Sequence, residues 1–221
     1  MQNLEPIAER VQEAFEARTR ARDQALAQAR ILTRHAAHAI RAIHRSEQSL
    51  AHEHLQEAKT LAAALKADLA LFPDLYYAGY TQDALKEYCE ASITVALIEN
   101  QPLPGPESLE QEYATFVNGL AESTGELRRR CMDILRQGYS QEAERLLGCM
   151  DDIYAVLVTL DYPDAITNGL RRQTDLVRGI VERTRGDLTI SLREQHLEQA
   201  LEKISARLRS IEDSNANDPS F

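Results

Sequence analysis

Apolar and alanine side chains recur every three or four residues from Leu4 to about Arg45, and no proline or glycine follows Pro6 in this stretch. Such spacing places the apolar side chains on one face of an α-helix. The pattern therefore predicts one unusually long first helix. A helix of that length with one apolar face needs other helices to pack against.

Helical spacing continues along the chain, interrupted by proline, glycine and polar residues that favour helix ends. Phe72-Pro73 is expected to end the second helix, because a residue before proline avoids the helical conformation. The helices expected after the first are 46–71, 82–99, 108–137, 141–160, 161–185 and 191–211. The expected caps are Ser46, Thr81 and Ser140 for the first, second and fourth of these, and a capping box of Ser108 and Gln111 for the third. A break at Gly186-Asp187 precedes the last helix. We therefore predict an all-α fold of about seven helices in a single domain at residues 1–211, followed by a loose polar tail at residues 212–221.

Composition supports a helical core and limits the kinds of partner. Of the 221 residues 43% are hydrophobic, with no tryptophan and only 9 glycines and 7 prolines. The net charge of −10 argues against a protein that coats nucleic acid without specificity, because phosphate binding depends on lysine and arginine. Any nucleic-acid site must therefore be local. No stretch reaches the roughly 20 apolar residues of a membrane span and no secretion signal is evident, so we expect a cytoplasmic protein.

Two glutamates stand out on the helix expected at residues 82–99. Glu87 and Glu90 are three residues apart and project from one helical face, while the run Ala91–Ile98 is apolar almost all round. Carboxylates on a buried helix need a cation or a metal ion, because burial of an unpaired charge is costly. Acids from neighbouring helices could complete an oxygen-only site of the kind that Mg²⁺ prefers; the candidates are Glu122, Glu126 and either Asp151 or Asp152. The alternative is a solvated face whose acids pair with nearby lysine and arginine.

Basic residues form a second pattern, on the long first helix. Arg34, His38, Arg41 and Arg45 recur at helical spacing, which makes a row that could hold phosphate groups. The alternative is that these side chains pair with the excess of aspartate and glutamate in the chain. A histidine metal site is disfavoured, because no cysteine or third histidine has a suitable spacing.

The residues around the two glutamates resemble a known signature. The segment Gly79–Ala91 is similar to the Trax signature, in which a Glu-Tyr-x-Glu-Ala sequence supplies two catalytic carboxylates. Three further segments resemble the same family: His44-Arg45 at the end of the first helix, Thr124–Arg129 with a Gly-Glu-Leu-x-Arg pattern, and Leu146–Tyr154. In the last of these, Asp152 matches the family's third catalytic aspartate better than Asp151 does. The chain thus resembles the translin/Trax family and, within it, the compact microbial Trax-like ribonucleases.

The resemblance implies a function as well as a fold. Translin/Trax proteins are α-helical, assemble into closed hollow octamers and bind RNA on the inner surface, and Trax-type subunits cleave RNA with Mg²⁺ held by carboxylates. The metal ligands that this resemblance implies, for Mg²⁺ or alternatively Mn²⁺, are Glu87, Glu90 and Asp152, with Glu126 as a fourth acid that binds metal or orients water. The RNA-binding residues that we expect are Arg34, His38, Arg41, His44 and Arg45. The expected protein is a Mg²⁺-dependent endoribonuclease that works as a homo-oligomer.

Two other functions fit the same sequence. A noncatalytic translin-like protein would bind RNA or single-stranded DNA without cleaving it, and its acids would only pair with arginine. A helical interaction module would use the arginine clusters as contacts between subunits and would ignore RNA at physiological salt. Cleavage that requires both Mg²⁺ and the two glutamates distinguishes the nuclease from these alternatives.

Overall fold

The computed structural model describes residues 3–216, in which helices are joined by short connections and no β-strand occurs. The long helices are α1 (Leu4–His44), α2 (Gln48–Asp68), α4 (Gly79–Ile98), α6 (Tyr113–Leu135), α7 (Gln141–Leu157) and α9 (Leu170–Ala216). Single helical turns are α3 (Pro73–Tyr76), α5 (Pro106–Leu109) and α8 (Asp164–Thr167). The all-α prediction and the long first helix are confirmed. Two expected helices form the single α9, so the long helices are one fewer than expected.

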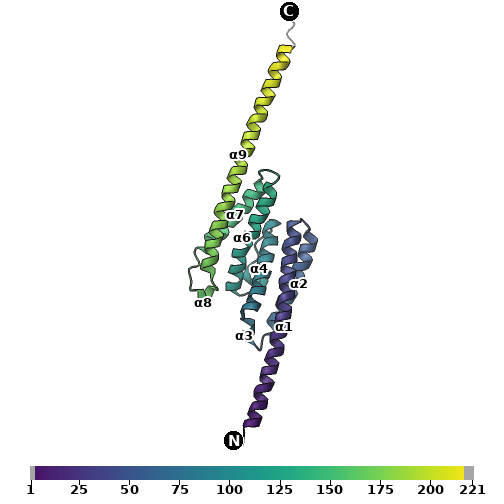
Figure 1. Ribbon diagram of the computed structural model, residues 1–221, viewed down its shortest axis with the longest axis vertical. Coiled ribbons are helices and arrows are strands. Elements are labelled where there is room, and N and C mark those ends of the chain that lie inside the picture. The colour runs from purple at the N-terminus through teal and green to yellow at the C-terminus, as the bar shows by residue number, and fades with distance from the viewer. Residues whose placement is uncertain (1–2, 217–221) are drawn as a thin grey trace, which may run out of the picture.

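Helix α4 occupies the middle of the bundle. It packs against α1 on one side and α6 on the other, while α2 packs on α1, and α7 and α9 pack on α6. Figure 1 shows that the first part of α1 and the last part of α9 extend beyond the bundle in opposite directions. The central place of α4 agrees with its apolar sequence, since Leu85, Ile93 and Val95 are each at most 1% exposed.

Buried alanines line the contacts of α1 and α2 with each other and with α4. The buried alanines are Ala25, Ala29, Ala36, Ala39 and Ala42 on α1, and Ala51, Ala58 and Ala62 on α2. Small side chains allow two helix axes to approach, and alanine is also the strongest helix former. Fully buried leucines such as Leu32 and Leu65 fill the space between these contacts and the rest of the core.

Two of the expected helix caps have different outcomes. Ser46 lies in the left-handed backbone region with φ of 62°, and α2 begins only after Glu47, so the cap expected at Ser46 is wrong. The cap expected at Ser140 is confirmed, because its hydroxyl accepts a hydrogen bond from the backbone N–H of Glu142 at the start of α7. Both are serines before helical sequence, and only the backbone conformation distinguishes them.

Two further caps were also wrong. Thr81 lies inside α4, which begins at Gly79, and its buried hydroxyl donates a hydrogen bond to the carbonyl of Leu75 at 2.8 Å. Ser108 lies in the separate turn α5 instead of opening α6, and its hydroxyl donates to the carbonyl of Gly105 at 2.8 Å. Serine and threonine bond to several kinds of nearby backbone group, so residue type alone does not assign a cap.

Helix α9 is continuous where a break was expected at Gly186-Asp187. Glycine inside a helix costs only about 1 kcal/mol relative to alanine, and the buried side chains of Val181 and Leu188 hold α9 against the bundle on both sides of it. The helix continues to Ala216, past the expected start of the tail, and residues 217–221 lie outside the described part. None of the described helices has an apolar stretch long enough to cross a membrane.

Candidate functional site

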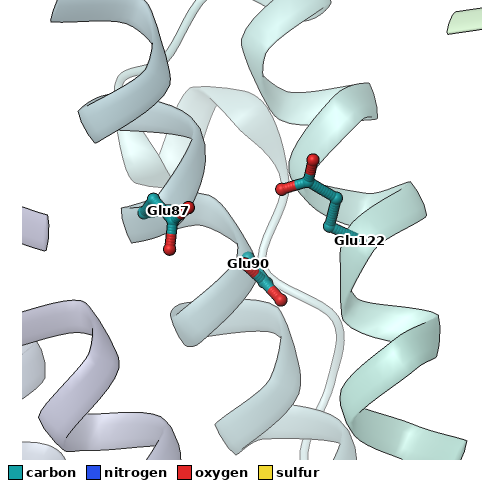
Figure 2. Close-up of side chains that lie close together, drawn as sticks. All are labelled: Glu87, Glu90 and Glu122. Carbon is teal, nitrogen blue, oxygen red and sulfur yellow. The ribbon is translucent and has the colours of Figure 1, made fainter. Parts of the chain in front are cut away.

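Three carboxylates converge between α4 and α6. Glu87 and Glu90 project from α4, and Glu122 projects from the facing helix α6 (Figure 2). One oxygen from each carboxylate lies within 4.8 Å of the other two, and all three residues are half-buried. The pair of glutamates on one face of α4 therefore meets a third acid from a neighbouring helix.

Gly119 brings the two helices together at this point. A Cβ atom at Gly119 would lie 2.6 Å from the Cβ of Cys89 and 2.9 Å from the carbonyl oxygen of Lys86. Both distances are shorter than an ordinary contact, so a glycine is required where α6 crosses this turn of α4. Glu122 follows Gly119 by about one helical turn, and the close approach carries its carboxylate to the glutamates of α4.

Burial and mutual repulsion raise the pKa of two of these acids. The pKa of Glu90 rises to about 8, first because of burial and then because of the negative charges of Glu87 and Glu122. Burial also raises the pKa of Glu87, where the Lys86 ammonium acts in the opposite direction. Lys86 bonds Glu122 at 2.8 Å, and the side-chain amide of Gln173 on α9 donates to the same oxygen at 3.0 Å. One ammonium group for three carboxylates is a balance that favours a further cation.

Glu126 lies one turn further along α6 and has partners of its own. Its carboxylate bonds Nε2 of His44 at 2.6 Å and the guanidinium of Arg129 at 3.4 Å. The hydrogen bond with His44 holds the pKa of Glu126 below its usual range. Glu126 is therefore an ionised group tied to the end of α1, outside the group of three acids. Its role as a fourth catalytic acid stays a prediction.

The aspartate expected to complete the site lies outside this group in the single chain. Asp152 is an exposed residue on α7 and is not one of the three acids within 4.8 Å of one another. The neighbouring Asp151 pairs with Arg185 on α9. Glu122 occupies the third position, and the sequence signal that could have selected it is Gly119, three residues earlier. Metal binding by Asp152 stays a prediction.

The structure divides the predicted RNA-binding residues of α1 into two kinds. Arg34, His38, Arg41 and Arg45 are exposed and lie at helical spacing, as a row that contacts phosphate requires. The side chain of His44, in contrast, is only 4% exposed and bonds a carboxylate of α6. His44 therefore positions that carboxylate and does not belong to the exposed row.

A cleft between α1 and α4 reaches the acidic group from one side. Its volume is about 370 Å³, and it shares Glu87 with the acids. Its other lining residues, which combine an apolar surface with a few polar groups, are Leu26, Ala29, Arg30, Thr33, Tyr80, Asp83 and Ala84. A small ligand or part of a larger one can therefore approach Glu87 through this cleft.

The acidic group has the chemistry of a site for a hard divalent cation. Mg²⁺ binds through carboxylate and water oxygens and usually keeps several waters beside its protein ligands. The three carboxylates supply such oxygens, and a cation there would offset the burial and the mutual repulsion that together raise the pKa of Glu90 to about 8. These residues can therefore hold a metal ion.

Comparison with known proteins finds relatives over most of the chain. No protein-family model matches it. An uncharacterised protein of Methanocaldococcus jannaschii is 30% identical over 190 residues, which cover 85% of this chain and 83% of the relative. AfC3PO is 31% identical to this chain. The structure of AfC3PO alone has a TM-score of 0.80, with 85% of this chain and 97% of AfC3PO covered. Its complex with duplex RNA has a TM-score of 0.77, with 88% and 98% covered. Apo-NeC3PO is 20% identical and shares the fold, with a TM-score of 0.74 over 86% of this chain and 98% of its own.

Proposed function

The chain belongs to the translin/Trax-like C3PO family, and from that membership we propose that it is a metal-dependent endoribonuclease. The observation that carries the proposal is the convergence of Glu87, Glu90 and Glu122 between α4 and α6. Two of these acids come from the segment that resembles the Trax signature. A shared fold does not supply a reaction, whereas acids with raised pKa values in a half-buried site are typical of functional centres.

Mg²⁺ is the cofactor that we assign to this site, with Mn²⁺ as an alternative. Glu87, Glu90 and Glu122 would hold it through carboxylate oxygens. When bound, Mg²⁺ supplies Lewis-acid chemistry, which activates water and stabilises negative charge on a phosphodiester. Lys86 orients Glu122 through their ion pair, and Glu126, fixed by the hydrogen bond with His44, is our candidate for orienting the attacking water.

RNA is the proposed substrate. The relative AfC3PO was solved in complex with duplex RNA, and this chain carries the exposed row of Arg34, His38 and Arg41 on α1 and Arg45 directly after it. Such a row supplies local phosphate contacts in a chain whose net charge is −10. Phosphate contacts fix the position of the RNA backbone, so this row would hold the substrate while the acids of α4 and α6 act on it.

The active form that we propose is a homo-oligomer, and by family resemblance an octamer. Each subunit would be a single domain over residues 1–211, and one kind of subunit would both bind and cleave RNA. A closed assembly places the same surface of every copy in equivalent positions. The basic rows of several copies could then surround one enclosed RNA, although each chain is acidic overall.

Cleavage of labelled RNA by the purified protein tests this function. We expect single-stranded or hairpin RNA to be cut in Mg²⁺ and to stay intact in EDTA. Glu87→Gln combined with Glu90→Gln should lower the cleavage rate at least about 100-fold, because ligand oxygens are lost. The matched control is Glu53→Gln with Glu57→Gln, two exposed acids on α2, which should cleave normally. Cleavage that persists in EDTA, or in the folded double variant, would contradict the proposal.

A noncatalytic translin-like protein that binds nucleic acid is the second candidate. In its favour, two acids of this region already have side-chain partners within the chain, Glu122 with Lys86 at 2.8 Å and Glu126 with His44 at 2.6 Å. The acids would then hold helices together, and RNA or single-stranded DNA would be bound without being cut. Tight RNA binding without any Mg²⁺-dependent cleavage in the same assay would favour this candidate.

A further inference from the structure

Three histidines meet on the surface shared by α1 and α2. His35 and His38 lie on α1, and His54 lies on α2. The Nδ1 atoms of His35 and His54 are 3.2 Å apart, and the ring of His38 stacks on the ring of His54 with centroids 5.0 Å apart. Spacing along the chain had offered no third histidine for a site on α1, and the packing of α2 against it supplies one.

We propose that these three imidazoles form a binding site for a transition-metal ion of the Zn²⁺ class. Imidazole nitrogen suits Zn²⁺, Cu²⁺ and Ni²⁺, whereas Mg²⁺ prefers oxygen. The histidine cluster shares no residue with the acidic group on α4 and α6. The two sites would therefore select different ions, and the histidine site does not depend on the proposed nuclease activity.

The distance between the two Nδ1 atoms fits such an ion. Zn²⁺ binds imidazole nitrogen at about 2.0–2.1 Å in a tetrahedral arrangement, so two ligands on one ion are about 3.3–3.4 Å apart. The observed separation for His35 and His54 is 3.2 Å. These histidines thus provide two ligand positions from different helices. To supply a third ligand, the exposed His38 would have to rotate out of its stacked arrangement on His54, and water would complete the tetrahedral set.

Nearby charges help to keep an imidazole in the form that binds metal. A histidine must be neutral to act as a ligand. Partial desolvation beside the neighbouring rings lowers the pKa of the exposed His38, and the charges of Arg41, the two other histidines and Arg34 act in the same direction. In the metal-free protein the close contact between His35 and His54 is a hydrogen bond that uses one ring N–H, and the ion would replace that proton.

The site is tested by titrating the full chain with Zn²⁺ in excess Mg²⁺. Calorimetry measures the binding, and thermal unfolding measures the Tm. We expect one Zn²⁺ per chain and a Tm that rises with Zn²⁺, because the ion joins α1 to α2 only in the folded state. His35→Gln and His54→Gln should each weaken Zn²⁺ affinity at least about 10-fold, with an unchanged metal-free circular dichroism spectrum. His52→Gln is the matched control: His52 is exposed on the same helix, bonds Glu99 at 2.9 Å, and should not affect Zn²⁺ affinity.

Two results would overturn the histidine site. One is the absence of Zn²⁺ binding by the wild-type chain, and the other is undiminished affinity in the folded His35 and His54 variants. Zn²⁺ bound at the acids would instead be lost in Glu87→Gln with Glu90→Gln, a variant in which the histidine site should bind normally. The outcome is therefore separate from whether the protein cleaves RNA.

Discussion

Glu90 carries a carboxyl group whose negative charge is opposed by its surroundings, since burial and the neighbouring acids raise its pKa to about 8. In an unfolded chain a glutamate titrates near pH 4.3. Between about pH 4.3 and 8 the folded state therefore holds a proton that the unfolded chain has released. The stability contributed by protonated Glu90 is present at low pH and is lost as the pH rises through 8. A bound divalent cation would replace that proton.

We therefore expect Glu90→Gln to stabilise the metal-free protein at high pH. In EDTA at about pH 8.5 the variant should exceed the wild type by about 1–2 kcal/mol, or about 2–8 °C in Tm, and the difference should shrink toward about pH 5. Mg²⁺ should raise the Tm of the wild type more than that of the variant. Thermal unfolding at several pH values, with EDTA or Mg²⁺, measures both effects. A variant less stable than the wild type in EDTA at high pH would show that the charge of Glu90 is already compensated.

Asp152 is the acid that the sequence favoured and that the single chain leaves exposed. If it completes the catalytic site, Asp152→Asn should reduce RNA cleavage at least about 10-fold. The Tm should change little, because substitutions of exposed side chains typically stay within about 0.5 kcal/mol. Asp151→Asn is the matched control, since it removes only the ion pair with Arg185 and should cleave normally. Normal cleavage by Asp152→Asn would leave the three glutamates as the acids of the site.

The sequence predicted which residues of α4 face the site but left the third acid open among Glu122, Glu126 and either Asp151 or Asp152, with the family resemblance favouring Asp152. Glu87 and Glu90 follow from three-residue spacing on a helix whose other faces are apolar. The choice of Glu122 over Glu126 depends on how α6 is rotated against α4, and the contact at Gly119 determines that rotation. Spacing within one helix holds no information about it.

Close packing of α4 against α6 is the condition for the site at the scale of the elements. Gly119→Ala would place a Cβ 2.6 Å from the Cβ of Cys89 and 3.0 Å from the backbone nitrogen of Glu90. The helices must then move apart, at a cost of about 1–3 kcal/mol, and Glu122 moves away from the acids of α4. We expect a lower Tm and at least about 10-fold slower Mg²⁺-dependent cleavage, measured by thermal unfolding and the RNA assay.

Gly125→Ala on the same helix is the control for that substitution. A Cβ at Gly125 would meet no atom within 4 Å, and alanine is favoured over glycine inside a helix by about 0.5–1 kcal/mol. This variant should have an unchanged or higher Tm and normal cleavage. If Gly119→Ala also behaved like the wild type, the separation of α4 and α6 would not govern the site.

The existence of the long helices followed from the sequence far better than their ends did. Each long helix repeats an apolar face over many turns, which is a strong signal. The start of a helix depends on one or two hydrogen bonds, so Ser46 and Ser140 looked equivalent although only Ser140 is a cap. The continuity of α9 depends on packing at Val181 and Leu188, which a local reading of Gly186 does not include.

At the scale of the whole molecule, the first part of α1 and the last part of α9 project beyond the bundle (Figure 1). Both helices carry exposed apolar side chains near these ends of the chain. On α1 these are Leu4, Ile7, Val11 and Phe15, which are 44–66% exposed, and on α9 they include Leu197, Leu201, Ile204 and Leu208, which are 54–61% exposed. Each set follows three- and four-residue spacing and so forms one stripe along its helix. Such stripes favour burial against another helix, which a second copy of the chain can provide.

We therefore expect the purified protein to be a homo-oligomer held in part by these stripes. Leu201→Glu with Leu208→Glu puts two charges into the α9 stripe and should lower the molar mass in light scattering while helical circular dichroism is retained, because both side chains are more than half exposed. Glu198→Gln with Glu202→Gln, on the same exposed stretch, should leave the mass unchanged. A monomeric wild type, or an unchanged mass in the leucine variant, would contradict this arrangement.

Cleavage measured on the same samples then decides whether the activity needs the assembly. If cleavage is lost when the assembly dissociates, the activity belongs to the oligomer. Full cleavage by the dissociated chain would show that one copy holds a complete site.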